Sequence, residues 1–154
     1  TMGDISPHFS RHEFGLSRAA AGAYGFAPAD YPEEWVDERL RPLVALLEAL
    51  RERLGGRPVT VIEAGGYRPR PYDMERIRRG ASGVSPNSQH HDGRAADVRV
   101  EGCTPSEVHA ALLELHEAGA IQLGGLGLYD TFTHVDLGPP GRRWDRRTRR
   151  DADD

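Results

Sequence analysis

The sequence predicts an α+β domain in which helices come first and a small, mainly antiparallel sheet with a helix packed on it follows. Leucines at helical spacing mark the first third of the chain, whereas short strand-like stretches mark the remainder. At 154 residues, the chain has the length of one globular domain. We therefore expect one domain over residues 1–140 and a charged, flexible tail over residues 141–154.

The first helices are predicted from their starting residues. Ser10 and Glu13 form a capping-box pattern, which predicts a short helix at this point. Residues 19–29 are rich in glycine and alanine, so we expect a loop there. Pro32, which precedes two glutamates, predicts the start of a second helix, and Pro42 should divide that segment.

The segment after Pro42 predicts a buried helix and then a strand. Five leucines at helical spacing define the buried side of the helix: Leu43, Leu46, Leu47, Leu50 and Leu54. Residues 59–62 are β-branched and predict a strand. Residues 65–88 are rich in glycine, proline, arginine and serine and show no sustained period. We expect a long loop there, and a loop of this length in a compact domain is more often functional than idle.

The second half of the chain predicts three more strands and one helix. Residues 95–100 have the pattern of a strand, and Thr104 with Glu107 forms a second capping box that predicts a helix. Residues 127–129 and 132–137 are short strand candidates joined by a tight turn.

Composition excludes several classes of site and partner. The net charge of −4 and the pI near 6.0 provide no global positive field, so we expect no nucleic-acid partner. Cys103 is the only cysteine, which excludes an intramolecular disulfide and a cysteine-based zinc site. No apolar run approaches the roughly 20 residues of a membrane span, and residues 1–10 lack the apolar core of a signal peptide. We expect a monomer.

One polar segment contains the residue types of a metal site. His90 and Asp97 flank Gly93 where a loop enters the predicted strand, so their side chains could approach one another. Imidazole nitrogens and carboxylate oxygens are ordinary zinc ligands, and His134 in a neighbouring strand could supply a third. Asp136 shares a face with His134 and could orient a ligand or a bound water. On spacing alone, surface loop histidines and a core histidine remain the competing interpretation.

Five ordered sequence blocks resemble a known family. The pattern Ser88-x-His90-x-x-Gly93-x-Ala95-x-Asp97 resembles the zinc signature of the D-alanyl-D-alanine carboxypeptidase and L-alanyl-D-glutamate endopeptidase family, whose fold is similar to the Hedgehog signalling domain. The other blocks are His8-Phe9-Ser10 with Glu13-Phe14, Gly66-Tyr67-Arg68, Gly125-Leu126-Gly127-Leu128-Tyr129 and Phe132-Thr133-His134-Val135-Asp136. The resemblance extends from about residue 9 to residue 137.

The resemblance implies a zinc peptidase that acts on peptidoglycan peptides, as a carboxypeptidase or an endopeptidase. One Zn²⁺ would be held by three side chains: His90, Asp97 and His134. Arg68 would stabilise the oxyanion, and Tyr67 and Ser88 would contact substrate, although Ser88 could equally brace the His90 loop. Such a protein would act in the cell envelope, the periplasm or the extracellular space, or within a phage lytic protein.

Two departures from the family pattern put the activity in doubt. Many relatives carry an acidic general base three residues before the last histidine, where this chain has Thr131. Asp136 and, ranked second, Asp130 are the candidate substitutes, and a branch ending in His-Val-Asp similarly lacks that acid. The stretch from Arg70 to Met74 also differs, which puts the choice of substrate in doubt.

Three alternatives therefore remain open at the level of sequence. A zinc-stabilised binding module without catalysis would explain Thr131, and a zinc hydrolase of another peptide or amide would explain the altered stretch after Arg68. The arginine-rich tail could contact anionic wall polymers, although a solvated tail is the simpler expectation. Trp144 could fold that tail onto the domain.

Overall fold

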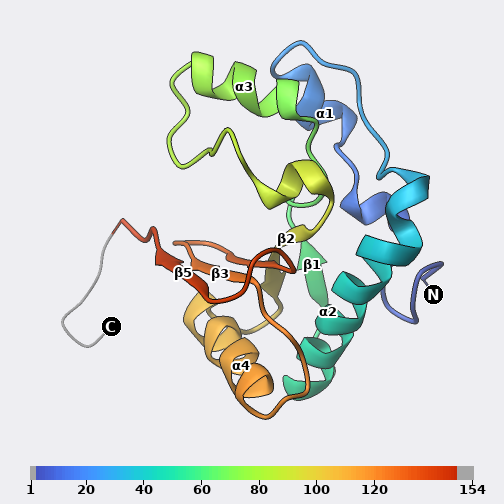
Figure 1. The fold of residues 1–154 in the computed structure, drawn as a ribbon, viewed down its shortest axis with the longest axis vertical. Helices are drawn as coiled ribbons and strands as arrows, with labels where there is room; N and C mark the ends of the chain where they lie inside the picture. Colours follow the sequence, from blue (N-terminus) through green and yellow to red (C-terminus); the bar gives the residue numbers. More distant parts are fainter. Residues whose placement is uncertain (1–2, 149–154) are drawn as a thin grey trace.

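A computed structural model describes residues 3–148 and confirms the α+β class (Figure 1). Within these residues, five strands form one sheet in the order β1-β2-β4-β3-β5. The strands are β1 (Val59–Val61), β2 (Ala95–Val100), β3 (Gly125–Leu128), β4 (Thr133–Asp136) and β5 (Arg142–Asp145). Neighbouring strands are antiparallel except for β3 and β5, which are parallel.

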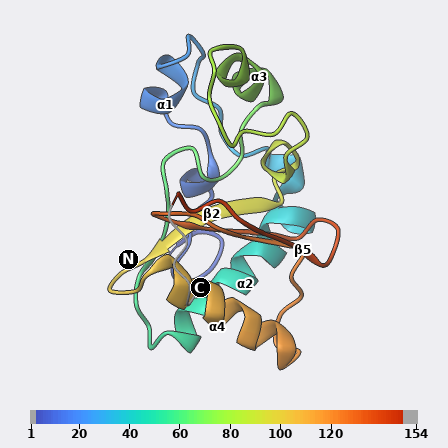
Figure 2. The ribbon, with the colours of Figure 1, turned by 90° about the vertical axis from the view of Figure 1, so that its left-hand side faces the viewer.

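Helices cover both sides of this sheet. The α-helices are α1 (Arg18–Gly22), α2 (Arg41–Arg53), α3 (Arg70–Arg78) and α4 (Pro105–Glu117). Short 3-10 segments are η1 (Arg11–Phe14), η2 (Glu33–Trp35) and η4 (Gln89–Asp92), and η3 (Val36–Leu40) is a π-helical turn. Figure 2 shows α2 and α4 on one side of the sheet and α1 and α3 on the other. No helix within residues 3–148 has both the length and the apolar character needed to cross a membrane.

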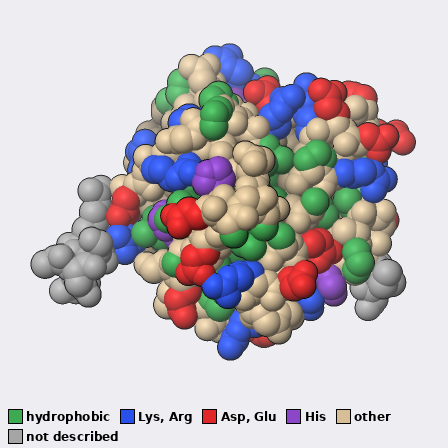
Figure 3. Space-filling model, turned by 60° about the horizontal axis from the view of Figure 1, so that its bottom comes forward, with side chains coloured by type: hydrophobic (Ala, Val, Ile, Leu, Met, Phe, Trp, Pro, Cys, Tyr) green, Lys and Arg blue, Asp and Glu red, His purple; other side chains and the backbone are tan. Residues whose placement is uncertain are grey.

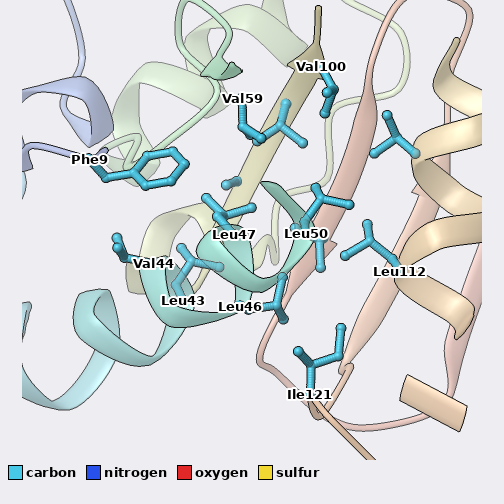
Figure 4. Packing of buried hydrophobic residues seen from close by; sticks show 14 of the residues in the cluster. Phe9, Leu43, Val44, Leu46, Leu47, Leu50, Val59, Val100, Leu112 and Ile121 are labelled. Atoms are coloured by element: carbon cyan, nitrogen blue, oxygen red, sulfur yellow. The ribbon is translucent and has the colours of Figure 1, made fainter. Parts of the chain in front are cut away.

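The hydrophobic core lies between the sheet, α2 and α4 (Figure 4). The predicted leucine stripe of α2 is buried at Leu43, Leu46, Leu47 and Leu50, and Leu54 packs against its edge. Val98 and Val135 face this core from β2 and β4. Because side chains alternate along a strand, the residues next to Val98 in β2 and next to Val135 in β4 face the opposite side of the sheet. The core therefore fixes which side of the sheet carries polar groups.

The predicted helix starts are confirmed. Both capping boxes form, with Ser10 at η1 and Thr104 at α4. The segment opened by Pro32 begins with η2, and Pro42 lies in the first turn of α2, where a missing backbone N–H does no harm.

Two segments that the sequence predicts as loops contain helices instead. The first of them, residues 19–29, contains most of α1, which Ser17 caps by accepting a hydrogen bond from the Ala20 N–H. Within residues 65–88, α3 begins beside Pro71 and buries only Tyr72 and Asp73, so no apolar stripe marks it. Both predictions were wrong for the same reason. Each helix buries only two residues, Ala20 and Ala21 in α1 and Tyr72 and Asp73 in α3, so neither has the apolar periodicity that marks a helix in the sequence.

The first part of the expected tail contains a strand of the sheet. Residues Arg142–Asp145 form β5, which pairs in parallel with β3. The strand packs closely on β3 because the Trp144 indole lies over Gly127. A Cβ atom at Gly127 would overlap the indole. The sheet therefore continues beyond the expected boundary at residue 140, whereas residues 149–154 of the expected tail lie outside the described part.

Candidate metal centre

The strand register brings the second and third predicted ligands together. Asp97 in β2 and His134 in β4 are directly paired across the two strands. Directly opposed residues on one face of an antiparallel pair have Cβ atoms about 5 Å apart. Both side chains face away from the core, because Val98 and Val135 occupy the core side. The sheet alone thus places a carboxylate beside an imidazole.

A capped 3-10 turn places His90 beside Asp97 and His134. Ser88 is the N-cap of η4, and its Oγ accepts a hydrogen bond from the His90 N–H at 3.1 Å. Gly93 ends the turn with a positive φ of 69°, and a Cβ there would lie 2.7 Å from the Tyr31 hydroxyl oxygen. Tyr31 in turn donates to the Gly93 carbonyl at 2.6 Å. The loop is therefore fixed at both ends, and the bracing alternative for Ser88 is realised.

The contacts of both histidines turn one ring nitrogen of each towards the other candidate donors. His90 Nδ1 lies 2.8 Å from the Gly66 carbonyl, which can only accept, so Nδ1 carries the proton and Nε2 keeps its lone pair. His134 Nε2 lies 2.7 Å from an Asp136 carboxylate oxygen and Nδ1 lies 2.9 Å from Asp97 Oδ1. The donor set is therefore His90 Nε2, Asp97 Oδ1 and His134 Nδ1.

This donor set fits a small divalent ion. The three side chains are buried, and each offers one donor atom within 4.8 Å of the others. His90 Nε2 lies 3.3 Å from Asp97 Oδ1. Donors bound tetrahedrally at about 2.0–2.2 Å from one zinc ion lie about 3.3 Å apart, so only a small movement of His134 is needed. The predicted ligands His90, Asp97 and His134 are thus brought together.

Burial and charge set the protonation of the group. Burial lowers the pKa of His90 and keeps it neutral. Burial also opposes protonation of His134, but the hydrogen bonds to Asp136 and Asp97 outweigh it and raise its pKa to about 9. Burial raises the pKa of Asp97, yet the two histidines hold it well below its usual range. The group therefore holds one proton, on His134, that a metal ion must displace.

Asp136 lies behind His134, on the side of the ring away from the donor nitrogen. Its side chain is fully buried, and Oδ1 accepts hydrogen bonds from the Gly125 and Gly138 N–H groups at 2.8 and 2.9 Å. Arg142 donates to both carboxylate oxygens. The predicted shared face with His134 is realised, but the carboxylate orients the ligand and is too enclosed to take a proton from a bound water. This placement does not support the predicted role as general base.

The other proposed substitute, Asp130, is turned away from the group. Its carboxylate accepts hydrogen bonds from the N–H and hydroxyl of Thr148 at 3.0 and 2.9 Å. Thr131 is exposed, and its carbonyl oxygen accepts from Arg99. Neither Asp130 nor Thr131 lines the pocket that contains the metal donors. The structure therefore brings neither residue to the place where a general base would act.

Arg68 does reach the donor group. Its Nη1 lies 3.8 Å from Asp97 Oδ2 and donates to the Ala64 carbonyl at 2.7 Å, while Nε donates to Asp73 at 3.0 Å. Nη2 has no hydrogen-bond partner among the described residues. Asp73 also accepts from His91 and Arg76, and although burial opposes it, these contacts lower the pKa of Asp73 to about 2.

Asp73 and His91 were missed as supports of the site. Asp73 lies in the first turn of α3, and the Pro71–Asp73 start followed by Arg76 and Arg78 near the end is a helix signal that the sequence did contain. Tyr67, by contrast, packs edge-on against Tyr31 and Trp35 and does not line the metal pocket. The arrangement therefore gives no support to substrate contact by Tyr67.

The third missed support is β5. Gly127 pairs with His134 on one side and with Trp144 on the other, and its missing side chain lets the indole reach the imidazole. The two ring centroids lie 4.9 Å apart. Trp144 Nε1 donates to the Tyr129 hydroxyl oxygen at 3.0 Å. The alternation Gly125-x-Gly127 in a strand was the available signal, since it indicates close approach by a neighbouring group.

A pocket of about 560 Å³ opens above the donor group. Residues of the 82–89 loop form one wall, and β5 with Tyr129 and Phe132 forms another. Ser88 lines this pocket beside His90, so it lies next to the space that a substrate would fill as well as bracing the turn. An open pocket over two imidazoles and one carboxylate is the arrangement of a catalytic metal site, because a fourth position is left for water.

The comparison with protein families shows which family the chain belongs to. Residues 29–144 match the Peptidase_M15_2 model, described as peptidoglycan L,D-endopeptidase MepK. The chain belongs to this family. The match includes every candidate donor residue and residues 142–144 of β5, and it confirms the predicted relation to peptidoglycan peptidases.

Individual proteins are also similar to this chain. The peptidoglycan L,D-endopeptidase MepK of Escherichia coli K12 is 36% identical over 101 residues, which cover 64% of this chain and 50% of that protein. The probable MepK of Haemophilus influenzae is 35% identical over 97 residues, which cover 62% and 48%. The chain thus spans about half the length of these curated relatives. The Serratia marcescens L-Ala D-Glu endopeptidase ChiX shows 21% identity and a TM-score of 0.46, covering 68% of this chain and 84% of that one.

Proposed function

We propose that this chain is a zinc-dependent endopeptidase that hydrolyses amide bonds in the peptide part of peptidoglycan. The observation that carries the proposal is the donor set of His90 Nε2, Asp97 Oδ1 and His134 Nδ1 at the floor of an open pocket. The family description and the names of the relatives support the endopeptidase over the carboxypeptidase alternative. We further propose that it acts as a monomer, in the cell envelope, the periplasm or outside the cell, or as part of a phage lytic protein.

The chain's own residues supply orientation and charge. A zinc ion bound to this donor set would polarise a carbonyl and lower the pKa of a bound water towards 7. Asp136 holds the His134 ring so that Nδ1 faces the pocket. Arg68 carries a permanent positive charge beside Asp97, and Asp73 holds its guanidinium in place, so it is positioned to stabilise an oxyanion that develops near the donors.

No free carboxylate of the described residues lines the pocket. Asp97 is a donor and Asp136 is enclosed. A positioned general base contributes typically 10²–10⁴-fold to a hydrolytic rate. We therefore propose a slow enzyme that relies on the lowered pKa of the water and on Arg68. The same observation favours one alternative, a zinc-stabilised binding module that no longer cleaves its ligand.

Peptidoglycan digestion separates these two functions. Purified sacculi are incubated with the zinc-loaded protein, and the soluble muropeptides are analysed by mass spectrometry. The endopeptidase predicts new peptide amines in amounts that grow with time, and His134→Ala abolishes them. A zinc-loaded protein that sediments with sacculi but releases no new amine would establish the binding module instead. Parallel rates on D-alanyl-D-alanine and on ordinary L-peptides test the carboxypeptidase and general amide hydrolase alternatives.

A further inference from the structure

The β5 wall of the metal pocket carries positive charge that the metal group does not use. Among the described residues, four arginines line the pocket, Arg68, Arg76, Arg142 and Arg146, against two aspartates. On the face shown in Figure 3, acidic and basic side chains are interspersed. The chain as a whole is negative, with a net charge of −4. The excess of positive charge is therefore local to the pocket, and a bound metal ion would increase it.

Three of these arginines already have acidic partners. Arg68 and Arg76 pair with Asp73, and Arg142 pairs with Asp136. Arg146 forms no ion pair within residues 3–148. Its backbone N–H donates to the Leu128 carbonyl at 2.8 Å, which continues the β5 ladder by one residue. This bond fixes the base of the side chain at the open end of the wall, two residues after Trp144.

Tyr129 supplies a second unused group at the same place. Its hydroxyl oxygen accepts the Trp144 Nε1–H, so the hydroxyl proton remains available for donation. No residue within the described range accepts a hydrogen bond from this hydroxyl. The Tyr129 ring is half-buried and held by stacking on Phe132, with ring centroids 4.4 Å apart. Burial raises the pKa of Tyr129, so the hydroxyl stays protonated, and the charges of Asp97, Arg146 and Arg68 are all near enough to act on it.

We propose that Tyr129 and Arg146 form a subsite for a carboxylate of the substrate, here called the carboxylate subsite. One carboxylate can accept from a hydroxyl and a guanidinium together, and this satisfies both unused donors. The inference that the ligand is a peptide rests on the proposed function. The subsite adds a substrate preference to that function, because it would select peptides that carry a negative charge beside the bond held at the metal. It also gives β5 a role in recognition.

Paired ligands test the subsite. The probes are a short stem peptide with free carboxylates and the same peptide with its carboxylates converted to amides. Affinity is measured calorimetrically on zinc-free protein, where no turnover occurs, and kcat and KM are measured on zinc-loaded protein. Wild type should bind the carboxylate form about tenfold more tightly, as expected for hydrogen bonds to a charged group. Arg146→Gln should reduce that preference to about twofold, and Arg146→Lys should restore part of it.

Arg143→Gln is the matched control. It removes the same charge from β5, but Arg143 faces the other side of the strand and donates to the Gly124 and Arg142 carbonyls. Tyr129→Phe should weaken the carboxylate form about threefold and leave the amide form unchanged. An unchanged preference in Arg146→Gln, or an equal loss in Arg143→Gln, would overturn the subsite, and so would a Tyr129→Phe effect on kcat alone. Failure of the proposed function looks different, since it removes turnover and leaves the binding preference intact.

Discussion

Replacement of Asp136 by asparagine distinguishes a positioning carboxylate from a general base. The exchange keeps the shape of the side chain and removes its charge. Oδ1 holds two backbone N–H groups, so the amide oxygen should keep that position and the amide NH₂ should take the place of Oδ2. The NH₂ group would then face His134 Nε2–H, donor against donor. To escape this clash, the imidazole must move its proton to Nδ1, the nitrogen that faces the metal.

Asp136→Asn should reduce the zinc affinity strongly and the free energy of unfolding moderately. Loss of a partner that orients a metal ligand reduces metal affinity about 10–100-fold. The forced change of tautomer places Asp136→Asn at the upper end, about 100-fold, or about 2.7 kcal/mol. The ion pair with Arg142 is partly exposed, so its loss should lower the free energy of unfolding of the zinc-free protein by only about 1–3 kcal/mol.

Competition with a chromophoric chelator measures the zinc Kd, and urea denaturation measures the stability. Asp130→Asn is the control, because it makes the same chemical change on an exposed carboxylate whose hydrogen bonds within residues 3–148 are to Thr148. It should leave the zinc Kd unchanged. Wild-type zinc affinity in Asp136→Asn together with lost turnover would refute the positioning role and restore the general-base interpretation.

Four further predictions follow from the same contacts. Because the pKa of His134 is about 9 in the zinc-free protein, zinc affinity should rise about tenfold per pH unit up to about pH 9, by calorimetry in matched buffers. Gly127→Ala should displace the Trp144 indole and shift tryptophan fluorescence. Arg68→Lys should lower kcat about 100-fold with little change in KM. The lowered pKa of Asp73 stabilises the fold above about pH 4, and that contribution is lost as pH falls through about 2, so Asp73→Asn should flatten the acid limb of the unfolding profile.

The metal donors could be predicted from the family resemblance, because spacing alone left surface and core histidines as a competing interpretation, and the structure shows how local order brings them together. His90 and Asp97 lie where a capped turn enters a strand, and the turn residue Gly93 sets their approach. His134 follows from the pairing of β2 with β4, which places it directly opposite Asp97. The choice of ring nitrogen could not be predicted, since it depends on the Gly66 carbonyl and on Asp136, which only the folded chain brings to the rings.

The supports of the site were harder to predict because they are not apolar. α3 buries Asp73 and shows no hydrophobic stripe, so its helix was read as loop. β5 carries three charged residues, and its Trp144 indole lies over Gly127, a contact between residues 17 positions apart in the sequence. Such elements are stabilised by specific polar partners and close backbone approach, and neither leaves a periodic signal.

A zinc titration of the cleavage rate tests the connection between the donor group and the chemistry. Chelator-treated protein receives increasing zinc, and the initial rate of amine release from muropeptides is followed. A metal-activated peptidase predicts a rate that rises linearly to one equivalent of zinc per chain and then stays level. His90→Ala should remain inactive across that range. A rate that does not depend on zinc, or one that reaches its plateau without His90, would contradict the assignment of His90, Asp97 and His134 as the catalytic metal ligands.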